Sequence, residues 1–209
     1  MPDFQFERKA LSQGYRSIAG LDEVGRGALF GPVVAAAVMF SSDRINAGSR
    51  GWLREIDDSK RINPLKRKQL CRLILIHADS VSWGVVSNQE IDKNNIYWAS
   101  FEAMRQALAK LPRSPDFLLV DGFELNEVNY PQEKILQGDR KSLSIAAASI
   151  VAKVLRDEMI IHLDRIFEGY GLAKNKGYGT KEHFAALQHR GPSIWHRHTF
   201  NLRKDMNHE

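Results

Sequence analysis

The sequence predicts an α/β fold, in which buried strands form a sheet that helices cover. Short apolar runs that end in turn residues indicate strands, and segments with apolar residues at helical spacing follow them. Strands that alternate with helices are typical of α/β proteins. The composition, with 43% hydrophobic and 26% charged residues, is that of a globular protein. It argues against a disordered chain, a collagen and a coiled coil.

Each predicted strand has the composition of a buried strand. Residues 17–24 (SIAGLDEV) end in a glycine-rich turn, and residues 32–40 (PVVAAAVMF) form a continuous apolar run. Further strands are expected at residues 81–86 and at residues 116–121 (DFLLVD). The polar segment 41–51 is predicted to be a loop.

Four helices are predicted from apolar residues at helical spacing. The first covers residues 64–78, with Asn63-Pro64 as its start signal. Residues 90–111 are expected to form one long helix. Residues 142–167 are rich in alanine and isoleucine, which predicts a largely buried helix, and residues 181–190 have a shorter amphipathic pattern.

The length of 209 residues suits a single domain over residues 1–209 with its own hydrophobic core. We expect the core of that domain at about 15–168 and a helical C-terminal part at about 169–200. The remaining residues, 201–209, form a polar tail.

Nothing in the sequence predicts export or a membrane span. The best apolar run, residues 33–40, is less than half of the roughly 20 residues that a spanning helix needs. The first 12 residues carry charges and have no apolar signal core. The single cysteine, Cys71, excludes an internal disulfide and a cysteine zinc cluster, and packing in a buried site is its expected role. We therefore expect a soluble, cytoplasmic protein that works as a monomer.

The charge balance favours a polyanionic partner. The chain has 30 Lys and Arg against 25 Asp and Glu, a net charge of +5 with histidine neutral. Residues 60–72 hold six Lys or Arg and no acid, and residues 171–209 hold seven Lys or Arg against three acids. Each basic segment alone is better explained as a solvated helix face. Together they frame a set of acidic motifs.

The acids of that set stand where predicted strands and loops end. Asp22 and Glu23 are adjacent at the end of an apolar strand, where two carboxylates are costly to desolvate unless a positive group lies between them. Asp121 ends a second buried strand, and Asp139 precedes the helix expected at 142–167. Ligands and metals collect at strand ends of α/β sheets. Each acid also has a simpler explanation, a turn or, for Asp139, a helix cap.

Four such acids in a basic protein indicate a hard divalent cation with oxygen ligands, Mn²⁺ or Mg²⁺. Two such ions with a bound phosphodiester form the arrangement for in-line hydrolysis. The acids are followed at once by Gly25-Arg26-Gly27, whose backbone N–H groups can form a nest for an anion or a hydroxyl. A tight turn is the simpler explanation of that tripeptide.

The motifs, taken in order, closely resemble those of the ribonuclease HII family. They span nearly the whole chain, and their order is far more specific than any single motif. The matching segments are GLDEVGRG at 20–27, GPVVAAAV at 31–38, DSK at 58–60, EID at 90–92 with NI at 95–96, VDG at 120–122, GD at 138–139, AAASIVAKV at 146–154 with RD at 156–157, KGYGT at 176–180, His196-Arg197 and Phe200.

The resemblance implies a ribonuclease H-like fold, a mixed sheet flanked by helices, with a helical C-terminal extension. It implies an endonuclease that hydrolyses the RNA strand of RNA–DNA hybrids and cuts 5′ of ribonucleotides embedded in duplex DNA. The products would carry 3′-hydroxyl and 5′-phosphate ends. Such an enzyme acts in ribonucleotide removal and in DNA replication and repair.

The resemblance also assigns residues. The family's catalytic, metal-binding acids fall on Asp22, Glu23, Asp121 and Asp139. The substrate-binding residues are of three kinds: a turn that reads the 2′-hydroxyl, a tyrosine beside the sugar at the RNA-to-DNA junction, and a motif that contacts phosphate. These fall on Gly25, Arg26 and Gly27, on Tyr178, and on Ser59 and Lys60, respectively.

Three positions depart from the usual family pattern. Phe30 stands where a small residue is expected, and its bulk beside the ribose-reading turn would change substrate preference. Arg140 follows Asp139 where serine or alanine is more usual, and we expect it to draw on the charge of Asp139 and weaken that metal contact. Ile145 is expected to affect packing only.

Other titratable residues receive simpler expectations. His183 and His196 lack the paired spacing of a metal site, and we expect them to contact phosphate or to be exposed. Asp157 is expected to pair with Arg156 or Lys153.

The sequence argues against three other classes of function. A nucleic-acid-binding protein without catalysis would keep the basic segments but has no use for four converging acids. A phosphohydrolase with an aspartyl intermediate needs a second acid two residues after its nucleophile, and Val24 stands there after Asp22. A serine hydrolase is disfavoured because the sequence has no Gly-x-Ser-x-Gly elbow.

Overall fold

The computed structural model describes residues 1–203, so residues 204–209 of the predicted polar tail lie outside the described part. Five strands form one mixed sheet in the order β3-β2-β1-β4-β5. β1 pairs antiparallel with β2 and parallel with β4, β2 pairs antiparallel with β3, and β4 pairs parallel with β5. The strands are β1 (Ile18–Val24), β2 (Val33–Met39), β3 (Ser80–Val86), β4 (Phe117–Asp121) and β5 (Gln132–Ile135).

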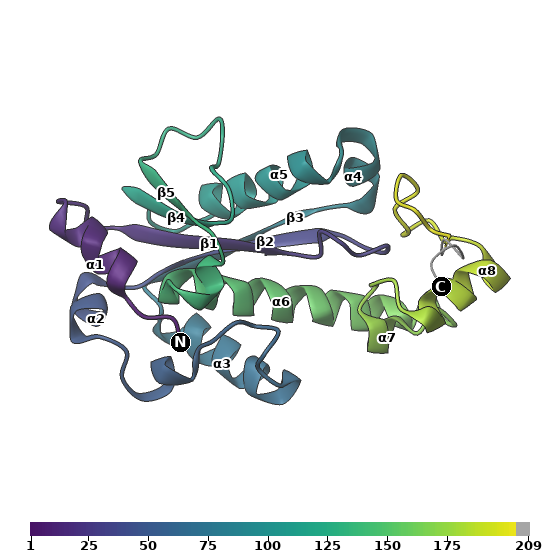
Figure 1. Cartoon of the computed structure of the whole chain (residues 1–209), viewed down its shortest axis with the longest axis horizontal. Helices are drawn as coiled ribbons and strands as arrows, with labels where there is room; N and C mark the ends of the chain where they lie inside the picture. Colours follow the sequence, from purple (N-terminus) through teal and green to yellow (C-terminus); the bar gives the residue numbers. More distant parts are fainter. Residues whose placement is uncertain (204–209) are drawn as a thin grey trace.

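Helices cover both faces of the sheet, which confirms the predicted mixed sheet flanked by helices. Figure 1 shows α5 on one side and α6 on the other, with α3 beyond α6. The helices are α1 (Gln5–Ser12), α2 (Ser42–Ala47), α3 (Pro64–His77), α4 (Asn88–Asn94), α5 (Ile96–Ala109), α6 (Leu143–Asp164), α7 (Leu172–Asn175) and α8 (Lys181–Arg190), with 3-10 turns η1 (Gly51–Glu55) and η2 (Gly138–Arg140). None of the helices within residues 1–203 combines the length and the apolar character that crossing a membrane requires.

Strand β2 is buried along its whole length because both of its faces carry apolar side chains. Alternate residues of a strand point to opposite faces of the sheet. On β2, Val34, Ala36 and Val38 join the apolar cluster under α6. The alternate residues Ala35 and Ala37 join the cluster under α5. The continuous apolar run that predicted a buried strand is therefore divided between two cores.

Two predictions about local structure are wrong. Residues 41–51, expected as a loop, contain α2, whose first turn is capped because the hydroxyl of Ser41 accepts a hydrogen bond from the N–H of Arg44 at 3.3 Å. The helix expected at 90–111 is two helices. Asn95 separates them with φ of +80°, and its side chain caps α5 by accepting from the N–H groups of Tyr97 and Trp98. Helix α1 and strand β5 were not predicted.

A third apolar cluster lies beyond the sheet, where α7 and α8 surround the end of α6 (Figure 1). It holds Leu29, Phe30, Ile160, Tyr170, Leu172 and Leu187, with Trp195 and Leu202 packed against them. The polypeptide after β1 therefore runs from the sheet into this cluster before it returns as β2. This path joins the glycine-rich turn to the C-terminal part of the chain.

Candidate active site

The topology of the sheet brings the predicted acids together. β1 and β4 are parallel neighbours in the register Leu21 to Val120, so Asp22 and Asp121 follow at the same end of adjacent strands. Asp139 lies on η2, between β5 and α6. The N–H of Gly138 donates a hydrogen bond to Oδ1 of Asp121 at 2.6 Å, which holds this turn against the end of β4.

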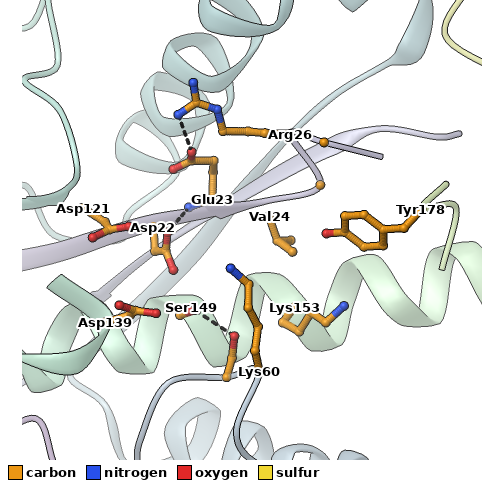
Figure 2. Close-up of a pocket in the computed structure, with 13 residues that line it drawn as sticks. Asp22, Glu23, Val24, Arg26, Lys60, Asp121, Asp139, Ser149, Lys153 and Tyr178 are labelled. Carbon is orange, nitrogen blue, oxygen red and sulfur yellow. Dashed lines mark hydrogen bonds and ion pairs between the residues drawn. The ribbon is translucent and has the colours of Figure 1, made fainter. Parts of the chain in front are cut away.

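A cleft of about 460 Å³ opens at this end of the sheet, and every site residue predicted from the sequence lines it. Figure 2 shows the acids on one side and Tyr178 on the other, above α6. Val24, Ser149 and Lys153 also line the cleft and were not predicted as site residues. Their signal was available, because Ser149 and Lys153 are four residues apart on one face of α6 and belong to a matching motif. The predicted residues in the cleft are Asp22, Glu23, Gly25, Arg26, Gly27, Ser59, Lys60, Asp121, Asp139 and Tyr178.

Asp22 is the most buried of the four acids, with 6% of its surface exposed. Burial raises its pKa well above the usual range, and the negative charges of Glu23 and Asp121 raise it further. Burial is also the main cause that raises the pKa of Asp121 and of Asp139. The ionised form of each of these acids is therefore costly in the cleft, although the nearby charges of Arg26 and Lys60 partly offset this cost at Asp121.

Glu23 points to the other face of the sheet from Asp22, as the alternation of side chains on a strand requires. Its Oε1 accepts a hydrogen bond from Nη1 of Arg26 at 3.2 Å, while its Oε2 is buried and has no hydrogen-bond partner in the described chain. Burial raises the pKa of Glu23, although the charge of Arg26 opposes the shift. The guanidinium of Arg26 also lies 5.2 Å from the ring centre of Tyr97.

Arg140 contacts a different acid from the one expected. Its Nη2 and Nε atoms donate to Oδ2 of Asp58 at 3.0 and 3.2 Å. The charge of Arg140 also acts to lower the pKa of Asp139, as expected, while burial and the charges of Asp58 and Asp121 raise it. A weaker metal contact at Asp139 stays a prediction. Burial alone would raise the pKa of Asp58. The backbone N–H of Lys60 and the Arg140 guanidinium outweigh that effect and lower it. Asp58 thereby holds the turn that presents Ser59 and Lys60 to the cleft, where the Ser59 hydroxyl lies 3.0 Å from that of Ser149.

The glycine-rich turn and Tyr178 are directly linked. Ala28 forms an antiparallel bridge with Tyr178, and the N–H of Leu29 donates to the carbonyl of Gly177 at 2.8 Å. Nζ of Lys153 lies 5.5 Å from the ring centre of Tyr178. Lys153 also pairs with Asp157 at 2.8 Å, as predicted. Two segments more than 140 residues apart in the sequence thus form one wall of the cleft.

Phe30 is not among the residues that line the cleft. Its side chain is fully buried in the C-terminal cluster, where its ring centre lies 4.9 Å from that of His196 and 5.9 Å from that of Phe167. The expectation that its bulk stands beside the turn is therefore wrong. The larger side chain is accommodated by packing against the C-terminal part of the chain.

The comparison with known families decides what kind of protein carries this cleft. A family model described as Ribonuclease HII matches residues 19–203. The chain belongs to the ribonuclease HII family. The ribonuclease HII of Moorella thermoacetica is 47% identical over 199 residues, which cover 94% of this chain and 92% of that protein. That of Enterococcus faecalis is 45% identical over 202 residues, or 97% of this chain and 76% of that protein.

Solved structures agree with this assignment. The ribonuclease H2 of Pyrococcus horikoshii has a TM-score of 0.72 and 25% sequence identity, with 89% of this chain and 94% of that chain covered. The RNase HII of Archaeoglobus fulgidus, solved as a PCNA complex, has a TM-score of 0.73 at the same identity, with 91% and 98% covered. The ribonuclease H-like fold is confirmed, and membership of the ribonuclease HII family makes the chain a nuclease.

The donor set of this ribonuclease HII cleft fits a hard divalent cation. Carboxylate oxygens are the ligands that Mg²⁺ and Mn²⁺ prefer. A cation would also offset the like charges that raise the pKa of Asp22, and it would give the buried Oε2 of Glu23 a partner. As the side chains stand within residues 1–203, no group of three or more His, Cys, Asp and Glu side chains is placed so that it could hold a metal ion. The acids line one cleft without forming a finished coordination shell.

Both histidines expected at phosphate or at the surface are fully buried, so that expectation is wrong. His183 lies on α8 and His196 lies in the segment after it, and their Nε2 atoms are 3.1 Å apart. Sequence spacing could not predict this contact, because it depends on how α8 folds back on the C-terminal cluster. The two histidines pack next to the segment that carries Tyr178, since Nδ1 of His183 lies 2.9 Å from the carbonyl oxygen of Tyr178.

Proposed function

We propose that this chain is an endoribonuclease that hydrolyses the RNA strand of RNA–DNA hybrids and cuts 5′ of ribonucleotides embedded in duplex DNA. The observation that carries the proposal is the composition of the cleft. Four carboxylates, a glycine-rich turn and a tyrosine line one space of about 460 Å³. Acids and a sugar-reading wall in one cleft suit a nuclease that selects its substrate by the sugar.

The turn supports selection of ribose. The 2′-hydroxyl is the group that distinguishes RNA from DNA locally. Within residues 1–203, the backbone N–H groups of Gly25, Arg26 and Gly27 make no hydrogen bond, and all three residues line the cleft. Backbone donors read a hydroxyl without regard to the base beside it. Tyr178, on the same wall, offers a flat ring for the neighbouring sugar.

The acids support metal-assisted hydrolysis by two divalent cations, with Mn²⁺ or Mg²⁺ as the candidates. Asp22, Glu23, Asp121 and Asp139 would hold the cations. Asp22 is the most buried of the four, with 6% of its surface exposed. Bound cations of this kind activate a water molecule and stabilise the leaving 3′ oxygen, which leaves 3′-hydroxyl and 5′-phosphate ends.

Cationic side chains oppose the acids across the cleft. Lys60 and Lys153 both line it, and Figure 2 shows the Lys60 ammonium directed toward the space between the acids and Tyr178. Carboxylates repel a phosphodiester, so such cations are needed to hold the backbone in place. The role of the enzyme would be ribonucleotide removal in DNA replication and repair, in the cytoplasm, where the buried Cys71 stays a thiol.

The experiment that tests this proposal is strand cutting of a DNA duplex that holds one ribonucleotide. We expect cutting 5′ of the ribonucleotide with Mn²⁺ or Mg²⁺, and none with a chelator, on an all-DNA duplex, or with the Asp22→Asn variant. Asp43→Asn is the matched control, because Asp43 is an exposed acid far from the cleft on α2. Folded protein that binds the duplex but never cuts it would favour the binding protein without catalysis. Cutting confined to long hybrids would contradict the ribose-reading role of the turn.

A further inference from the structure

Two arginines are fully buried beside the ribose-reading turn. Arg156, on α6, and Arg197, in the C-terminal segment, each have 0% of their surface exposed. Neither forms an ion pair with a carboxylate anywhere in residues 1–203. A buried guanidinium without a counterion is costly, so these two side chains call for an explanation other than stability.

Two nitrogen atoms of each guanidinium donate to backbone carbonyls of one short segment, whereas Nη2 of Arg197 is buried and has no hydrogen-bond partner within residues 1–203. Arg156 donates from Nε to Pro32 at 2.9 Å and from Nη2 to Phe30 at 3.0 Å. Arg197 donates from Nε to Gly31 at 3.0 Å and from Nη1 to Arg26 at 2.9 Å. The segment 26–32 thus has four carbonyls fixed by two side chains that come from distant parts of the sequence.

Arg156 also lies directly beneath the turn. Gly25 has φ of +95°, and a Cβ atom built on it would stand 2.2 Å from Nε of Arg156. The third donor of Arg156, Nη1, reaches the carbonyl of Lys176 at 2.9 Å, two residues before Tyr178. One guanidinium therefore supports both parts of the wall that would contact the ribonucleotide.

Arg197 sets the direction of a donor in the turn. The carbonyl of Arg26 and the N–H of Gly27 belong to the same planar trans peptide, so they point in opposite directions. Because Arg197 holds that carbonyl toward the protein interior, the N–H of Gly27 points away from the interior. Gly27 lines the cleft, so this N–H is directed to where the substrate sugar would lie.

We infer that Arg156 and Arg197 are positioning residues that aim the N–H groups of the turn Gly25–Gly27 and so determine the preference for ribose over deoxyribose. The inference rests on the proposed function, and it adds the residues that make the turn selective. Neither arginine needs to touch the substrate. Burial and the like charge of Arg156 lower the pKa of Arg197 to about 9, which still leaves it charged at neutral pH.

Lysine is the informative replacement at both positions. It keeps the positive charge and most of the volume, but it lacks the planar fork that holds two carbonyls at fixed angles. Arg197→Lys should therefore no longer hold the Arg26–Gly27 peptide in one orientation, and it leaves the acids of the cleft unchanged. His198→Ala is the matched control, since His198 is the exposed neighbour of Arg197 in the same segment.

The test measures the dissociation constant for two duplexes, one with a single ribonucleotide and one of DNA alone, by fluorescence anisotropy with chelator present. The preference for ribose is the dissociation constant for the all-DNA duplex divided by that for the ribonucleotide duplex. We expect Arg197→Lys and Arg156→Lys to reduce this ratio at least tenfold. The reduction should come from weaker binding of the ribonucleotide duplex, with binding of the all-DNA duplex unchanged. In cutting assays KM should rise at least tenfold while kcat changes less than threefold. His198→Ala should match the parent protein.

A merely structural role would lower the affinity for both duplexes alike and lower the melting temperature. Parent-like ratios in both lysine variants would overturn the inference and leave the proposed function standing. A parent protein without any preference for the ribonucleotide duplex would overturn the ribose-reading turn itself, and this inference with it. If Arg197→Lys does not fold, the ratio of dissociation constants measured for Arg156→Lys tests the inference in its place.

Discussion

The Nε2 atoms of His183 and His196 lie 3.1 Å apart, between two imidazoles that are fully buried. The N–H of Ser193 donates to Nδ1 of His196 at 2.9 Å, so the proton of neutral His196 resides on Nε2. That proton is shared with Nε2 of His183, whose Nδ1 then donates to the carbonyl of Tyr178 at 2.9 Å. The pair links the C-terminal segment to the tyrosine of the cleft and requires both rings to be neutral.

This pair predicts that acid destabilises the fold. Burial, reinforced by the neighbouring His183, lowers the pKa of His196 from 6.5 to about 4. In the unfolded chain the ring takes up a proton near pH 6.5, whereas the folded protein keeps it neutral down to about pH 4. The free energy of unfolding should therefore fall as the pH falls through this window, by about 3 kcal/mol from His196 alone. Urea denaturation at pH 7.5 and 4.5 measures the loss.

The matched comparison uses His196→Gln, which does not titrate, and His198→Gln, which changes an exposed histidine. Both are needed because carboxylates with raised pKa values, such as Glu7, act in the opposite direction. The pH-dependent loss should shrink in His196→Gln and persist in His198→Gln. An equal loss in all three proteins would show that the pair has no such role.

Much of the fold could be predicted because its signals are local. Buried strands such as β2 are continuous apolar runs, and α3 begins at its predicted cap, Asn63, whose side chain accepts from the N–H of Lys66 at 3.0 Å. The break at Asn95 was missed because one residue with positive φ interrupts an otherwise helical pattern. Strand β5 was missed because its sequence, QEKI, is polar and only its last residue is buried.

The candidate site was predictable for a different reason. Its residues stand in short motifs, and parallel pairing of β1 with β4 joins two of those motifs at one edge. What the sequence could not indicate is which side chains support the motifs. Arg140 acts on the charge of its neighbour Asp139 as expected, but its hydrogen bonds go to Asp58, and Phe30 packs against Phe167; only the fold brings these partners near.

Substitution of Gly20 tests the close packing between β1 and α6. A Cβ atom at Gly20 would stand 2.3 Å from the carbonyl carbon of Ser144, which is backbone and has no room to move. Gly20→Ala should therefore destabilise the protein by about 1–3 kcal/mol, the range for overpacked cores. Gly27→Ala is the control, because nothing lies within 4 Å of its added Cβ. Chemical denaturation that gave both variants the parent stability would refute the close contact.

We expect substitution of Asp22 by asparagine to abolish activity and to stabilise the folded protein. Its pKa is raised by burial and by the charges of Glu23 and Asp121, so above about pH 3.8 the ionised form costs the folded state free energy. Asp22→Asn removes that charge while its Oδ1 can still accept from the N–H of Glu23, a bond of 2.7 Å in the parent. We expect Asp22→Asn to have a higher melting temperature than the parent protein at pH 7.5 with chelator, because the costly charge is gone.

The same gain should vanish near pH 3, where the aspartate of the parent is neutral in the folded and the unfolded chain. Asp43→Asn, an exposed acid on α2, should leave the melting temperature unchanged at both pH values. A melting temperature of Asp22→Asn below that of the parent at pH 7.5 would mean that the carboxylate is already compensated by the protein itself.

Divalent cations should then stabilise the parent protein, because they offset the charges that make Asp22 and its neighbours costly. A ligand that binds only the folded state at ten times its dissociation constant adds about 1.4 kcal/mol, or roughly 3–6 °C here. Differential scanning fluorimetry with Mg²⁺ or Mn²⁺, reversed by chelator, measures the shift. The double variant Asp22→Asn, Asp121→Asn should lose it, and Asp43→Asn should keep it. A shift of the same size in the double variant, or with sodium chloride at matched ionic strength, would mean that general screening rather than binding at the cleft accounts for the effect.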